Sequence, residues 1–157
     1  MIIYRGNIFN DNVFYSEVDL PMQNTAGEST AGNWSVDAIR AVTNAEIAFE
    51  NPTYASRDLY RGYSSTADFF NVFPHIYDPK TENTWSVKTF ELTGAITKFL
   101  IAGLYRSGLN LRVSNAKVVL DLNKSLGQVH SVETNGKALE GFKKYKIAGT
   151  DGVLAVF

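Results

Sequence analysis

Apolar and polar residues alternate along much of the second half of the chain, and this two-residue period predicts β-strands. The turn pair Asn135-Gly136 between two alternating runs predicts a tight hairpin. Residues 145–147 and 153–157, separated by Gly149-Thr150-Asp151-Gly152, predict a closing hairpin. The other alternating runs are residues 84–92, 109–113, 116–122, 128–134 and 137–139.

A longer apolar stripe in residues 93–107 changes the period from two to about 3.6 and favours a helix. Thr93 is placed to cap its start and Gly108 to end it. On a helix, the apolar residues would cover nearly the whole circumference. The segment is therefore compatible with a buried main helix at about 94–107 and also with two strands broken at Gly103. A shorter helical segment is expected near 35–44, followed by a strand through Phe49.

These elements together predict a β-rich α+β fold, in the form of an antiparallel β-sandwich or a barrel-like sheet with one main helix. No repeat or linker divides the sequence, so residues 1–157 are expected to form a single domain. Residues 21–33 are small and polar and are expected to form a flexible loop.

Composition narrows the possible chemistry of the protein. The chain has no cysteine, which excludes disulfides, thiolate metal sites and a cysteine nucleophile. Thirteen asparagines among 157 residues suit turns and a neutral polar surface of the kind found in extracellular and virion proteins. The first residues lack the pattern of a signal peptide. We therefore expect a virion or extracellular location reached without one, with assembly in the cytoplasm as the alternative.

No catalytic motif is apparent. The two histidines, His75 and His130, are interpreted as a loop residue and a solvent-facing strand residue. The segment Gly62-Tyr63-Ser64-Ser65-Thr66 departs from the nucleophile-elbow pattern at its fifth residue. No phosphate loop, dinucleotide motif or metal-binding histidine pair is found, so the sequence predicts no cofactor, no metal site and no enzyme.

An aromatic segment, residues 53–90, offers the best candidate for a ligand or partner surface, because rings beside arginines can stack on sugars or bases. The alternative is that these rings fill the core. The candidate residues are Tyr54, Arg57, Tyr60, Arg61, Tyr63 and Trp85.

The formal net charge of −1 hides a polarised chain. Residues 1–58 hold eight acidic and three basic residues, whereas residues 98–146 hold nine basic and three acidic ones. The two parts either pair inside one domain, lie on opposite faces and bind copies of the chain, or direct a basic face toward DNA or an acidic shell. The candidate basic face consists of Lys117, Lys124, Lys137, Lys143, Lys144 and Lys146.

The leading hypothesis from the sequence is a non-enzymatic structural protein of a bacteriophage virion, such as a capsid-decoration, connector or tail protein. Its expected partners are copies of itself or other proteins of a larger assembly, without a membrane and without nucleic acid as the main ligand. The alternatives are a carbohydrate-binding β-sandwich module, for which a glycan is the ligand, and a small hydrolase.

Overall fold

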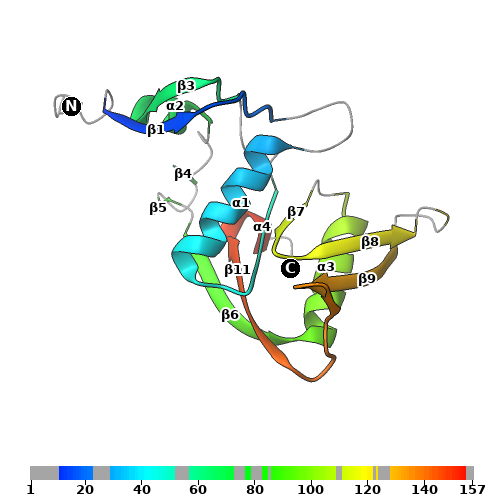
Figure 1. Ribbon diagram of the computed structural model, residues 1–157. Coiled ribbons are helices and arrows are strands. Elements are labelled where there is room, and N and C mark those ends of the chain that lie inside the picture. Colours follow the sequence, from blue (N-terminus) through cyan, green and yellow to red (C-terminus); the bar gives the residue numbers. More distant parts are fainter. Residues whose placement is uncertain are drawn as a thin grey trace. The chain divides into compact units, whose positions relative to one another are not determined.

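The computed structural model describes most of the chain as strands and short helices (Figure 1). The residues described are 11–22, 29–51, 57–72, 77–78, 83–84, 86–108, 111–121, 123 and 128–154. Their strands form open sheets rather than a closed barrel, and the prediction of a β-rich α+β fold is confirmed. No helix in these ranges is long and apolar enough to cross a bilayer.

The chain divides into two compact units. The first comprises residues 1–31 and 53–84, and the second comprises residues 32–52 and 85–157. The prediction of one domain over residues 1–157 is not tested by this division and stays a prediction.

The first unit is built on a short antiparallel ribbon. Strand β1 (Asn12–Ser16) pairs with β3 (Gly62–Ser65), and helix α2 (Thr66–Val72) follows directly. Its start is capped by Ser65 and Asp68, because the Asp68 carboxylate accepts from the Ser65 backbone N–H at 2.8 Å. The two-residue strands β4 (Tyr77–Asp78) and β5 (Asn83–Thr84) pair with each other.

The second unit is centred on a sheet with the order β6-β11-β2-β7. Its strands are β6 (Val87–Thr93), β11 (Lys144–Thr150), β2 (Ile47–Glu50) and β7 (Arg112–Ser114). All four residues of β2 are buried, as expected for a central strand. Strands β2 and β11 run parallel, with Ile47 opposite Ile147, so the expectation of a purely antiparallel sheet is wrong at this pair.

Helix α1 (Thr30–Thr43) leads into β2 and packs on the sheet through Val36 and Ile39. It begins earlier than the predicted segment 35–44, and its first residues, 30–33, were expected to lie in a loop. Ala31 is fully buried, so packing outweighs the weak helix signal there. The predicted loop 21–33 is therefore wrong for residues 30–33, and residues 23–28 lie outside the described part.

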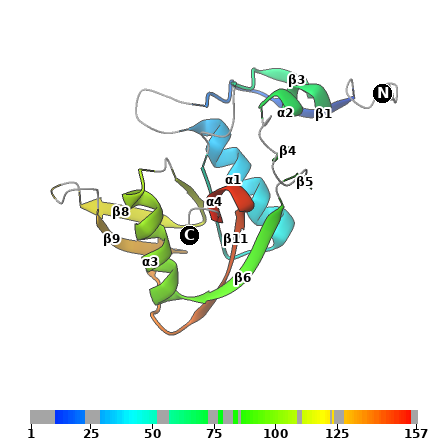
Figure 2. The same ribbon diagram turned by 180° about the vertical axis from the view of Figure 1, so that it is seen from behind.

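Helix α3 (Gly94–Arg106) confirms the predicted main helix and rules out two strands broken at Gly103. Thr93 caps it by accepting from the Ile96 N–H at 3.4 Å. A three-stranded sheet, β8 (Lys117–Asp121), β9 (Gln128–Thr134) and β10 (Lys137–Ala138), lies beside this helix (Figures 1 and 2).

Asn135 and Gly136 both have positive φ, as the predicted hairpin turn between β9 and β10 requires. The predicted closing hairpin is wrong, because Asp151–Leu154 forms the short helix α4. A brief apolar run such as residues 153–157 has no periodicity that separates a strand from a buried helical turn. Residues 155–157 lie outside the described part.

Candidate functional site

The parallel strands β2 and β11 end side by side, and polar residues follow both. Glu50 is the last residue of β2 and Thr150 the last residue of β11. Asn51 and Asp151 come next, and Asn51 is buried to 3% exposure. In sheets with parallel strands, ligands bind beyond the carboxyl ends of such strands.

Close packing between β2 and β11 fixes this edge. Gly149 lies opposite Phe49, and a Cβ at Gly149 would approach the Phe49 ring to 2.9 Å. Glycine is therefore required for the two strands to meet at this spacing. Phe49 is fully buried, so the strand ends are set on a rigid core.

Glu50 is the buried acid of the site, with 6% of its surface exposed. Burial raises its pKa above the ordinary value of 4.5 by disfavouring the charged form. The Thr150 side chain and the Asn51 N–H, which donates to Glu50 Oε1 at 2.8 Å, act in the opposite direction on this pKa. Arg112 lies opposite Glu50 in the β2–β7 pairing and brings a guanidinium to the same edge.

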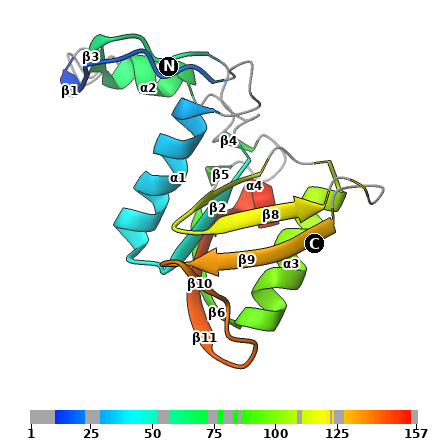
Figure 3. The same cartoon turned by 45° about the vertical axis from the view of Figure 1, so that its right-hand side comes forward.

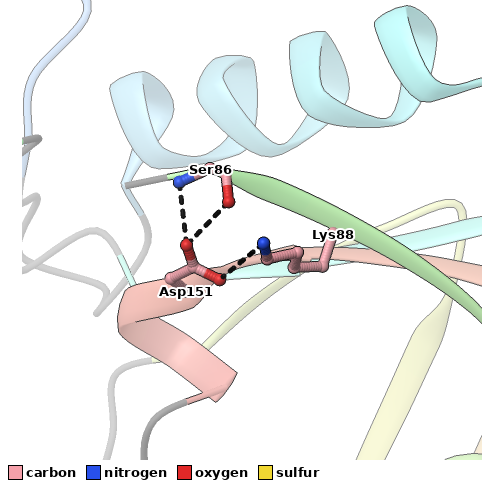
Figure 4. A network of polar contacts seen from close by, with 3 residues as sticks. All are labelled: Ser86, Lys88 and Asp151. Atoms are coloured by element: carbon pink, nitrogen blue, oxygen red, sulfur yellow. Dashed lines mark hydrogen bonds and ion pairs between the residues drawn. The ribbon is translucent and has the colours of Figure 1, made fainter. Parts of the chain in front are cut away.

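Asp151 is held by Ser86, the residue before β6 (Figure 4). The Ser86 N–H and hydroxyl donate to Asp151 Oδ2 at 2.9 and 2.7 Å, and the Asp151 N–H donates to the Ser86 carbonyl at 3.1 Å. These hydrogen bonds lower the Asp151 pKa below 3.8, so this carboxylate is ionised at neutral pH. Lys88 Nζ lies 3.9 Å from Asp151 Oδ1.

We call these residues the strand-end cluster. They combine carboxylates, an amide, hydroxyls and a guanidinium within one unit, a set suited to binding hydroxyl and amide groups of a polar ligand. The cluster consists of Glu50, Asn51, Ser86, Arg112, Thr150 and Asp151.

The predicted aromatic surface lies partly in the first unit. Arg57, Tyr60, Arg61 and Tyr63 are all exposed, with Tyr60 and Tyr63 at 70% and 72%. Tyr63 is joined by Tyr15, whose ring centroid lies 4.9 Å away across the β1–β3 pair.

Tyr54 and Trp85 are outside the described residues, as is His75. For the described tyrosines, exposure argues against the core alternative, and a ligand role stays a prediction. His130 in β9 is exposed, as predicted.

The candidate basic face is brought together only in part. Lys137, Lys143, Lys144 and Lys146 lie in β10, the following segment and β11, whereas Lys117 lies in β8. Acidic residues from other elements are interleaved, because Glu133 is opposite Lys117 and Glu91 lies 3.7 Å from Lys144. The surface is therefore mixed in charge rather than uniformly basic. Lys124 lies outside the described residues.

Sequence reasoning missed the strand-end cluster. Asp151 is placed there in the turn of the predicted closing hairpin, and neither Glu50 nor Asn51 is singled out. The available signal was a polar residue after each of two apolar strands, but the sequence gives no sign that these strands are neighbours. Within the described residues, no group of three or more His, Asp or Glu side chains is arranged to hold a metal ion.

Comparison with known proteins decides the family. Residues 12–155 match the 5′-nucleotidase, C-terminal domain family. The chain belongs to this family. No curated protein sequence matches it.

Solved structures share the fold. A 5′-nucleotidase precursor from Thermus thermophilus superposes with a TM-score of 0.72 at 19% identity, over 94% of this chain and 31% of that one. The NAD nucleotidase of Haemophilus influenzae gives 0.70 at 12% identity, over 92% of this chain and 29% of that one. The sulfate thiohydrolase SoxB of Thermus thermophilus gives 0.70 at 19% identity, over 91% and 28%. The chain thus spans about a third of the length of these structures.

This family corrects the functional hypotheses from sequence. A virion structural protein, whether a capsid-decoration, connector or tail protein, has no support, and the assignment as a non-enzyme is wrong because the family is that of an enzyme domain. The carbohydrate-binding alternative is replaced as well. An extracellular location is compatible with the family, whereas a virion location is not supported.

Proposed function

We propose that this chain is the substrate-binding domain of a hydrolase of the 5′-nucleotidase type, and that the strand-end cluster binds the nucleoside part of a nucleotide. The observation that carries the proposal is the position of Glu50, Asn51 and Asp151 at the carboxyl ends of two neighbouring parallel strands. The family match and the nucleotidases among its structural neighbours support a nucleotide as the ligand class.

The two carboxylates of the cluster suit a ribose and a base better than a phosphate. Asp151 is an ionised acceptor, and a carboxylate accepts hydrogen bonds from sugar hydroxyls but repels a phosphate. Asn51 adds an amide that can both donate and accept. In this proposal the chain orients the nucleoside, while the phosphate points away from the two carboxylates.

Titration of the purified chain with AMP, adenosine and inorganic phosphate tests the proposal, with amide NMR shifts as the readout. We expect AMP and adenosine to shift the amides of Asn51, Ser86 and Asp151, and phosphate alone to leave them unchanged. If phosphate reproduced the AMP shifts, or if AMP shifted none of these amides at about 20 mM, where even weak ligands are bound, the proposal would be wrong.

Asp151→Asn and Lys117→Gln are the matched variants, since Lys117 is exposed on β8 outside the cluster. Asp151→Asn keeps the size of the side chain but removes its charge. We expect adenosine affinity to fall about tenfold in Asp151→Asn, as for loss of one charge-assisted hydrogen bond, and to be unchanged in Lys117→Gln.

A further inference from the structure

A cavity lies at the end of the parallel strands opposite the strand-end cluster. Its volume is about 320 Å³, within the lower range of small-molecule sites. Its walls come from the β9–β10 hairpin, the segment before β11, and Glu46 in the connection from α1 to β2. Figure 3 shows the hairpin turn beside that connection. We call it the hairpin pocket.

One wall of the hairpin pocket is fixed by backbone hydrogen bonds. The Gly94 N–H donates to the Lys143 carbonyl at 2.9 Å, and the Ala95 N–H donates to the Gly141 carbonyl at 3.1 Å. The Glu140 N–H donates to the Tyr145 hydroxyl at 3.0 Å. The segment from Glu140 to Lys143 is thereby tied to the start of α3, so the pocket is formed before any ligand enters.

The charged side chains that line the pocket are balanced in sign but not paired with one another. Lys137 and Lys143 bring two ammonium groups, and Glu46 and Glu140 bring two carboxylates. Ion pairs in the described part of the chain join Lys88 to Asp151 and Lys144 to Glu91, and none joins two of these four residues.

Existing contacts leave these charges available. Lys143 Nζ lies 5.1 Å from the centroid of the buried Tyr145 ring, a cation–π contact that positions the ammonium without neutralising it. Glu46 Oε2 accepts from the Lys146 N–H at 3.1 Å, while its Oε1 accepts no hydrogen bond from the described residues. The pocket therefore presents ready donors and ready acceptors at the same time.

This balance decides the class of ligand. A polyanion would face Glu46 and Glu140, and a polycation would face Lys137 and Lys143. A ligand with one carboxylate and one ammonium satisfies both sets and brings no net charge. We propose that the hairpin pocket binds a small zwitterion of the α-amino acid type, with its carboxylate toward the lysines and its ammonium toward the glutamates.

The test is an amide NMR titration of the ¹⁵N-labelled chain with L-alanine. Acetate, methylammonium and their equimolar mixture supply the same charges on separate molecules. We expect L-alanine to shift the amides of Asn135, Lys137, Gly141 and Lys143 at concentrations where the mixture does not, because joining the two charges avoids a second loss of translational freedom. Equal shifts with the mixture, or no shift with L-alanine at about 50 mM, would overturn the proposal.

Two variants remove one charge of each sign, and a third is the control. Lys137→Gln and Glu46→Gln should each weaken L-alanine binding about tenfold, as for loss of one charge-assisted contact. In Glu46→Gln the amide oxygen of the new side chain can still accept from the Lys146 N–H, so the fold is kept. Lys117→Gln removes an exposed lysine outside the pocket and should leave the affinity unchanged. Equal affinities in Lys137→Gln and Lys117→Gln would exclude the proposed site.

This inference is independent of the nucleotide site. Adenosine and L-alanine are expected to shift amides at opposite ends of the β2–β11 pair. Either titration can fail while the other succeeds.

Discussion

The two ends of the β2–β11 pair differ in how their charged groups are held. At the carboxyl end, Asp151 is bound by Ser86 and Glu50 is buried against Thr150 and the Asn51 N–H. At the amino end, Lys137, Glu140 and the other charged residues of the pocket are exposed, and none of the ion pairs found in the described part of the chain joins two of them. One sheet thus carries a site whose charged groups are held by burial and hydrogen bonds and another whose charged groups are exposed.

The largest effect is expected at the amino end, where the start of α3 packs on the backbone of the pocket wall. A Cβ at Gly94 would collide with the Glu140 carbonyl, which belongs to the wall of the hairpin pocket. Gly94→Ala should therefore lower the free energy of unfolding by about 1–3 kcal/mol, the usual cost of overpacking. It should also shift the amides of Gly141 and Lys143.

Chemical denaturation and NMR of this variant measure both effects. The matched control is Gly141→Ala, because a Cβ at Gly141 would meet no atom within 4 Å. If both variants lost the same stability, close packing of the pocket wall on α3 would not be the cause.

A smaller effect of definite sign is expected at Glu50. Its folded-state pKa lies above the unfolded value, so the folded state binds the proton more tightly, and stability falls as pH rises from 4.5 through the folded pKa. Glu50→Gln removes this titration. Urea unfolding at about pH 4.5 and about pH 8 should show a loss of stability in the wild type that is absent in the variant.

The result that would contradict this prediction is an equal change in both proteins. If the free energy of unfolding of the wild type changed between the two pH values by the same amount as that of Glu50→Gln, the ionisation of Glu50 would not affect stability.

The smallest effect is expected at Asp151, and its sign is opposite. Its folded-state pKa is lowered below 3.8, so its contribution to stability is present above that pH and lost as pH falls through the folded pKa. Asp151→Asn should cost less than about 1 kcal/mol at neutral pH because the group is exposed to solvent. Unfolding curves of variant and wild type should converge in strong acid; curves that stayed parallel down to acid pH would contradict this.

Local signals predicted much of the fold, because short-range physics sets those elements. Thr93 and Gly108 bracket α3, and the Asn135-Gly136 turn follows from the positive φ that both residues adopt. The early start of α1 was missed because Gly32 and Asn33 are weak helix formers, whereas the burial of Ala31 stabilises this first turn through packing.

The candidate sites were missed for a different reason. Nothing local in the sequence indicates that β2 and β11 are parallel neighbours, so Glu50 and Asp151 could not be placed at one edge. The lysines of the candidate basic face could be identified from the sequence. The acidic residues that lie beside them could not, because they belong to elements that are distant in the sequence. Glu46, for example, is 100 residues from its hydrogen-bond partner Lys146. Charge along the chain is therefore a poor guide to charge on this surface.

That separation also sets the order in which the molecule can assemble. Strand β11 lies between β6 and β2, so the central sheet has no continuous ladder until β11 is in place. During synthesis, the buried strand β2 must wait for the ribosome to add about a hundred residues before its parallel partner exists. Contacts so distant in sequence close slowly, and the apolar residues of β2 stay exposed meanwhile. We expect nascent chains halted before Lys144 to bind chaperones and to lack the protease resistance of the finished unit.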